Sequence, residues 1–152
     1  MRSKINKLLI LEKLSKLVDY IKELDPILAA DAGHFLVKEN YRDLRALERD
    51  FQLIVDGMIE INSHFIKQLN LSIPDDYTNT FISLGQNKIL PLDFSIKLAR
   101  VVGLRNKIVH KYDIIDQAKF IDDLKNNGKQ FKEYIKFIKQ YLNENNQEHK
   151  IQ

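Results

Sequence analysis

The sequence predicts an all-α protein, an up-and-down four-helix bundle with short accessory helices. Apolar residues recur every three or four positions over long stretches, which is the spacing of one helix face. Five glycines and three prolines in 152 residues are too few for a fold of many short strands and turns. With 44% hydrophobic and 30% charged residues, the chain can bury one core and keep a polar surface. We therefore expect a single domain over residues 1–152.

The N-terminal part carries an amphipathic pattern over residues 3–24, which predicts the first long helix. Asp25-Pro26 is expected to end that helix and to start a short one, because proline suits the first helical turn. Residues 27–37 are weakly helical, and Gly33 is expected to mark a bend.

The strongest pattern lies over residues 40–70 and predicts a helix of seven or eight turns. Gly57, inside this helix, is expected to allow close contact with a neighbouring helix. Pro74 follows the helix and is expected to stop it, and an aspartate beside it is expected to cap a short helix over residues 76–87. The apolar stripe of the long helix consists of Leu44, Leu47, Phe51, Ile54, Met58, Ile61, Phe65 and Leu69.

Pro91 is expected to open one continuous helix that ends near His110. Because apolar residues cover more than half of its circumference, we expect it to lie centrally and to be covered on two sides. The last helix is expected to start at Asp113, with Asp116 in the acidic position of a capping box. Residues 143–152 are polar and are expected to fray.

Composition and spacing exclude several kinds of site. The chain has no cysteine, so it forms no disulfide, thiolate metal site or cysteine nucleophile. The four histidines do not lie at metal-ligand spacing, and no glycine-rich phosphate loop is present, so no metal or cofactor is expected. No apolar run approaches the roughly 18 residues of a membrane-spanning helix, so we expect a cytoplasmic protein without a membrane partner.

The positive charge gathers towards the C-terminus. Residues 97–152 hold twelve Lys/Arg against seven Asp/Glu, whereas the whole chain has a net charge of only +3. This distribution fits a phosphate-bearing partner, and it fits an ordinary lysine-rich helix surface equally well.

Residues 105–112 place an arginine, an amide, an imidazole and a phenol close together in the sequence, as Arg105, Asn106, His110 and Tyr112. A guanidinium binds a phosphodiester and stabilises charge developing on phosphorus, while a neutral imidazole can take a proton from a hydroxyl. These groups suffice for metal-independent RNA cleavage with the ribose 2′-hydroxyl as nucleophile. Alternatively, the arginine is solvated, the histidine caps a helix end and the tyrosine packs at the rim.

The segment resembles the Arg-x4-His-x-Tyr motif of HepT-like toxins in the HEPN superfamily, in its form Arg-Asn-x-x-Val-His-x-Tyr. The resemblance covers roughly residues 40–142. It implies a HEPN-like helical homodimer in which two motifs face each other across a composite RNA-cleaving cleft. It also implies catalysis by Arg105 and His110, positioning of the RNA by Asn106, and attachment of AMP to Tyr112 by a cognate minimal nucleotidyltransferase (MNT) antitoxin. An adenylate beside Arg105 would block an RNA phosphate by its bulk and its charge.

Two other functions remain open from the sequence. The chain could be a non-catalytic helical subunit that binds substrate or nucleotide for a nucleotidyltransferase. It could also be a structural helical adaptor, which is all that its apolar stripes require.

Overall fold

The computed structural model describes residues 5–110 and 117–151. At a few of these positions, His110 among them, it describes the backbone alone. The helices are α1 (Lys7–Leu28), α2 (Ala32–Leu36), the 3-10 turn η1 (Lys38–Asn40), α3 (Tyr41–Gln68), α4 (Tyr77–Gln86), α5 (Leu92–Leu98), α6 (Val101–His110) and α7 (Gln117–Ile151). The described residues contain no strand.

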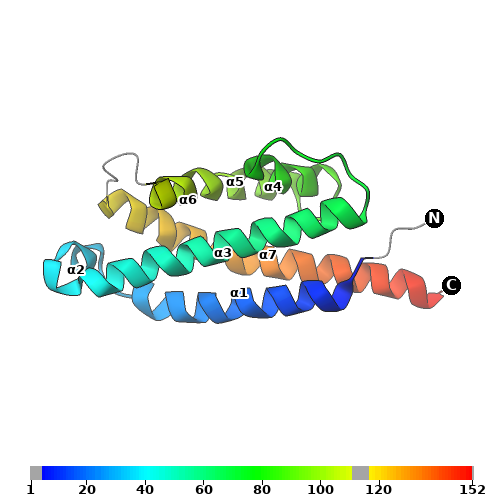
Figure 1. Cartoon of the computed structure of the whole chain (residues 1–152). Coiled ribbons are helices and arrows are strands. Elements are labelled where there is room, and N and C mark those ends of the chain that lie inside the picture. Colours follow the sequence, from blue (N-terminus) through cyan, green and yellow to red (C-terminus); the bar gives the residue numbers. More distant parts are fainter. Residues whose placement is uncertain (1–4, 111–116, 152) are drawn as a thin grey trace.

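The long helices α1, α3 and α7 lie nearly side by side, with α4, α5 and α6 forming a further layer on α3 (Figure 1). Successive long elements reverse direction: α1, α3, the α5–α6 pair and α7 alternate along the bundle (Figure 1). The predicted all-α, up-and-down arrangement is therefore confirmed. No helix in the described segments combines the length and the apolar character needed to cross a bilayer.

The core forms around α3. The predicted apolar stripe of this helix is buried from Leu44 to Phe65, and the ring of Phe51 packs against those of Phe120 and Phe131 on α7. On the other side of α3, Gly57 faces α1: a Cβ atom there would lie 2.5 Å from Leu17 Cδ2. The expected close contact at Gly57 is thus present, and it brings α1 against α3.

A chain of buried polar groups joins three helices inside this core. The Tyr134 hydroxyl of α7 lies 2.7 Å from Asn62 Oδ1 of α3 and 3.2 Å from the carbonyl oxygen of Met58. Asn62 Nδ2 donates to Thr80 Oγ1 of α4 at 3.3 Å, and Thr80 Oγ1 donates to the carbonyl of Tyr77 at 2.6 Å. Because each group has a partner, burial of these polar side chains is tolerated.

Local hydrogen bonds define both ends of α4. Asp76 caps this helix, since its carboxylate accepts a hydrogen bond from the backbone N–H of Asn79 at 2.8 Å. After α4, Lys88 adopts a φ of 62°, and the N–H of Ile89 donates to the carbonyl of Leu84 at 2.9 Å. This left-handed residue with a six-to-one bond is a Schellman ending, which turns the chain towards α5.

Proline does not stop the first helix, and that prediction is wrong. Pro26 lies inside the last turn of α1, which continues to Leu28. A proline this close to the end removes one helical hydrogen bond, and Ile27 and Leu28 gain contact with the core by remaining helical. At the other end of the chain, α7 is assigned as far as Ile151, and no proline or glycine follows Gly128. Fraying of residues 143–152 stays a prediction.

The segment expected as one helix from Pro91 is two helices with a tight turn between them. Arg100 N–H donates to the carbonyl of Lys97, and Val102 N–H donates to that of Ala99, so the chain tightens to three-residue steps there. The two halves pack on different neighbours, α5 mainly on α4 and α6 on α3. The expected cover on two sides is missing too, because Leu92 and Ile96 of α5 are 46% and 44% exposed.

Candidate active site on α6

Arg105 lies on the face of α6 that packs towards α3. It shares this face with Val101 and Ile108, and both of these are buried. The Arg105 side chain is only 18% exposed. A charged group in an otherwise apolar stripe needs a partner, and α3 supplies one.

The guanidinium of Arg105 is held at two points. Its Nε donates to Oδ1 of Asp56 on α3 at 2.8 Å, and its Nη1 donates to Oδ1 of Asn106 at 3.1 Å. The Asp56 side chain is 38% exposed, so the pair lies at the edge of the core and not in its centre. Solvent can therefore reach one side of a guanidinium whose orientation is already defined.

The remaining motif residues are placed less completely. His110 is the last residue of α6, and the structure describes its backbone only; Tyr112 and the predicted caps Asp113 and Asp116 lie outside the described residues. In a continuous helix, the Cα of a residue five positions on lies about 7.5 Å along the axis and roughly 140° around it. The structure thus brings Arg105 and Asn106 together, and the positions of the imidazole and the phenol stay predictions.

The histidines on α2 and α3 lie in environments that are typical of structural residues. His34 Nε2 lies 2.7 Å from Oδ2 of Asp43, and Asn40 Nδ2 donates to the carbonyl of His34, so this group fastens α2 to the start of α3. The sequence suggests a pairing of His64 with Glu60, but Glu60 forms its ion pair with Lys13 at 2.6 Å. Lys13 is also the main reason that the pKa of Glu60 is lowered, and His64 adds a smaller electrostatic effect.

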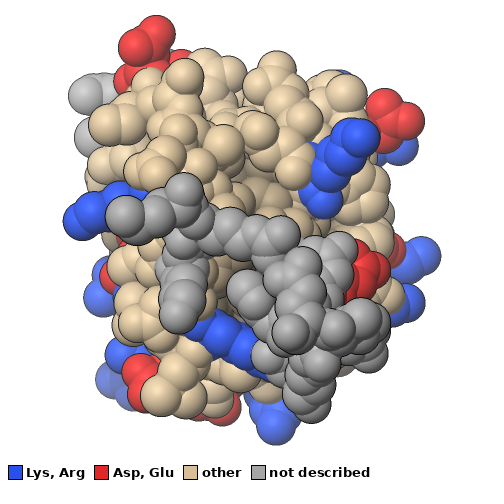
Figure 2. Space-filling view, turned by 90° about the vertical axis from the view of Figure 1, so that its right-hand side faces the viewer, with Lys and Arg blue, Asp and Glu red and all other residues tan. Residues whose placement is uncertain are grey.

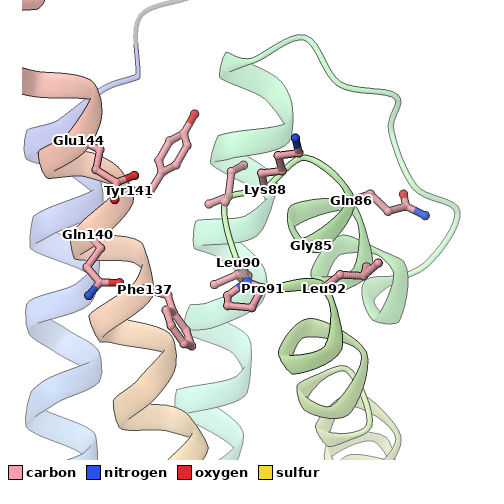
Figure 3. A pocket seen from close by; sticks show the side chains of 11 residues that line it. Gly85, Gln86, Lys88, Leu90, Pro91, Leu92, Phe137, Gln140, Tyr141 and Glu144 are labelled. Atoms are coloured by element: carbon pink, nitrogen blue, oxygen red, sulfur yellow. The ribbon is translucent and has the colours of Figure 1, made fainter. Parts of the chain in front are cut away.

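A hollow of about 520 Å³ lies between the α4–α5 connection and α7, away from the motif (Figure 3). Phe137 and Tyr141 of α7 face Leu90 and Pro91 across it. The lining contains no histidine and no arginine, so it offers few of the groups that phosphate chemistry uses. At the end of the bundle near the termini, the described residues in view show charges of both signs scattered over the surface and no concentrated basic patch (Figure 2).

Among the described residues of this site, Asp56 is the one that sequence reasoning missed. A signal for it exists, because Arg105 falls within a buried stripe and must meet an acceptor there. The sequence does not say which acidic residue that is, since the partner lies 49 positions away.

Comparison with known proteins agrees with the resemblance carried by residues 105–112. The family model for ribonuclease HepT-like proteins matches residues 17–138. The tRNA nuclease HepT of Aphanizomenon flos-aquae is 31% identical over 134 residues, which cover 87% of this chain and 86% of that protein. The mRNA nuclease HepT of Shewanella oneidensis is 25% identical over 131 residues, covering 86% of this chain and 96% of that protein.

Among solved structures, the tri-AMPylated HEPN toxin of Shewanella oneidensis in complex with MNT antitoxin matches with a TM-score of 0.77 and 25% identity. The match covers 86% of this chain and 96% of that one. The family named from residues 105–112 is therefore confirmed by the sequence and by the fold together. This chain belongs to the ribonuclease HepT-like family.

Proposed function

We propose that this protein is the toxin of a HEPN/MNT toxin–antitoxin pair and acts as an endoribonuclease in the cytoplasm. Family membership supports the ribonuclease class, and the relatives named above are a tRNA nuclease, an mRNA nuclease and a toxin bound to its MNT antitoxin. The observation that carries the proposal is the oriented, largely buried guanidinium of Arg105 beside Asn106 in the matched motif. We further infer that residues 1–152 form one HepT-like domain.

In this proposal Arg105 and His110 are the catalytic pair. His110 takes the proton of a ribose 2′-hydroxyl, whose oxygen attacks phosphorus; the P–O5′ bond breaks and the leaving oxygen takes up a proton. Arg105 stabilises the charge that develops on the phosphoryl oxygens, and Asn106 positions the phosphate by hydrogen bonding. The products are an RNA with a 2′,3′-cyclic phosphate and an RNA with a 5′-hydroxyl, and no metal takes part.

We propose that the active form is a homodimer with a composite cleft. Two observations support this arrangement. The Cα of His110 lies roughly 140° around α6 from that of Arg105, so the two residues lie on different faces of one helix. Leu92, Ile96 and Val109 expose apolar side chains along α5 and α6, where a second copy can cover them.

The antitoxin would act on the same motif. An MNT partner is proposed to attach AMP to Tyr112, which brings a bulky anion close in sequence to the arginine that binds RNA phosphate. Co-expression with a cognate minimal nucleotidyltransferase is expected to add the mass of AMP to a peptide containing Tyr112 and to abolish RNA cleavage. Unmodified, inactive protein from that co-expression would count against the AMP switch and leave the ribonuclease proposal standing.

The central experiment is RNA cleavage by the purified protein, with product ends determined chemically. Wild type is expected to give 2′,3′-cyclic phosphate ends, and Arg105→Ala and His110→Ala are expected to lose cleavage and growth arrest together. His64→Ala is the matched control, because it removes a histidine from the flank of α3 and is expected to leave cleavage unchanged. Cleavage at wild-type rate by His110→Ala would refute the assigned roles. A stable complex with the nucleotidyltransferase but no cleavage by any form would favour the non-catalytic subunit instead.

The dimer is tested separately by light scattering at a fixed protein concentration. Ile96→Glu places a charge in the exposed stripe and is expected to yield monomer with little cleavage. Leu8→Glu, at an even more exposed apolar position on α1, is the control and is expected to stay dimeric. A dimeric and active Ile96→Glu variant would rule out this surface as the interface.

A further inference from the structure

The bonds to Asp56 and Asn106 use only part of the Arg105 guanidinium. Asp56 Oδ1 accepts from Nε and Asn106 Oδ1 accepts from Nη1, while Nη2 takes part in neither bond. A phosphodiester is bound through paired guanidinium N–H groups, so an acceptor at Nε sets the direction in which the remaining donors point. Asp56 therefore determines the orientation of Arg105 without occupying all of its donors.

Asp56 is itself fixed by the most deeply packed helix of the bundle. Its neighbours Val55 and Met58 are fully buried, and Gly57 places α3 against Leu17 of α1. The carboxylate thus projects from a backbone that cannot shift without disturbing the core. A long arginine side chain has many rotamers, and a rigid anchor removes most of them before RNA binds.

We propose that Asp56 is a positioning residue for RNA cleavage, which orients the Arg105 guanidinium towards the scissile phosphate. This inference rests on the proposed ribonuclease function. Orientation of a charged group before the reaction begins is what makes it effective in the transition state, because no reorganisation is then required as charge develops.

The same carboxylate also opposes binding of the substrate. A negative charge next to Arg105 reduces the local positive charge that attracts RNA phosphate. Removing it has two opposed effects, weaker orientation and stronger electrostatic attraction, and these appear in different kinetic constants. Loss of orientation lowers kcat, whereas loss of the negative charge leaves KM unchanged or lowers it.

The test compares Asp56→Asn with Glu60→Gln in the full-length protein. Glu60 lies one turn further along α3 and forms its ion pair with Lys13 of α1, so both variants lose one carboxylate from an α3 ion pair and have the same net charge. The kinetics of cleavage of a short RNA are measured for each, together with thermal unfolding to confirm that the variants are folded. Asp56→Asn is expected to lower kcat by about 10- to 100-fold at equal or lower KM, and Glu60→Gln to leave kcat within about twofold. Asp56→Glu keeps the charge on a longer side chain and is expected to give a kcat between those of wild type and Asp56→Asn.

The outcomes separate this inference from the function on which it rests. If wild type does not cleave RNA at all, the ribonuclease proposal fails. If wild type cleaves and Asp56→Asn retains the wild-type kcat or exceeds it, Asp56 merely competes with phosphate and the inference is overturned. An equal loss of kcat in Glu60→Gln would also overturn it, because the effect would then belong to α3 ion pairs in general. Should Asp56→Asn be unfolded at the assay temperature, a wild-type kcat in Asp56→Glu gives the same refutation.

Discussion

Replacing Tyr134 by phenylalanine tests the buried polar groups that join α7 to the centre of the bundle. The hydroxyl is fully buried, and burial raises the pKa of this phenol well above its ordinary value, so the group stays protonated. It has one proton, and the shorter contact, 2.7 Å to Asn62 Oδ1, is the better hydrogen bond. The substitution keeps the ring in the core and removes only this donor.

The magnitude follows from what Asn62 loses. Asn62 is fully buried and keeps its bond to Thr80, but its Oδ1 no longer has the Tyr134 donor. A buried polar atom deprived of its partner costs about 1–3 kcal/mol. For a chain of this size, a central value of about 2 kcal/mol lowers Tm by roughly 4–8 °C.

Thermal unfolding followed by circular dichroism, at one protein concentration, measures this loss. Tyr141→Phe is the control, because Tyr141 lies two turns later on α7 and its ring packs edge-to-face with that of Phe65, a contact that phenylalanine preserves. Its free energy of unfolding is expected to change by less than about 0.5 kcal/mol. Equal losses in both variants, or none in Tyr134→Phe, would show that the Asn62 contact contributes nothing.

Two further predictions concern pH and packing. Burial, and then a hydrogen bond with Glu23, raise the pKa of Asp50 to about 6. Because this pKa exceeds the ordinary value for aspartate, protonated Asp50 favours the folded state, and this contribution to stability is lost as pH rises through about 6. At neutral pH, the free energy of unfolding of Asp50→Asn is therefore expected to exceed that of wild type by about 1–2 kcal/mol, after allowance for solvent around the exposed Glu23. Near pH 4 the two proteins are expected to be equally stable. Urea unfolding at both pH values measures the difference. Gly85→Ala places a Cβ atom 2.0 Å from Ser95 Oγ and is expected to lose about 1–3 kcal/mol, whereas Gly103→Ala, with nothing within 4 Å, gains up to about 1 kcal/mol. A stable Gly85→Ala variant, or a pH-independent gain in Asp50→Asn, would contradict the respective argument.

The parts of the fold that depend on neighbours in the sequence were predictable. The apolar repeat from Leu44 located α3 to within a few residues, and Asp76 acts as the cap that its position suggests. The break at Ala99 was not predictable, because Leu98, Ala99 and Arg100 are all good helix formers. It arises from two different packing partners, and these are known only once the bundle has formed.

The candidate site also contains residues that the sequence could predict and one that it could not. Arg105 and Asn106 could be chosen from residue type and spacing, and the structure places them together. Asp56 could not be chosen in this way. A carboxylate between apolar positions on α3 has the pattern of any surface residue of a helix, and only the packing of α6 distinguishes it. Arg105 in a buried stripe required an acidic partner, and only the contact between α3 and α6 identified it.

The ten-residue length of α6 has a consequence for how such a motif may be transferred between proteins. Isolated helices shorter than about 12–15 residues are only marginally stable in water, so α6 depends on α3 for its shape as well as for the anchor of Arg105. A peptide spanning residues 101–112, or the same residues grafted onto an unrelated helix, would keep the sequence signature and lose the oriented guanidinium. Transplanting the activity would require the Asp56 segment of α3 to travel with it.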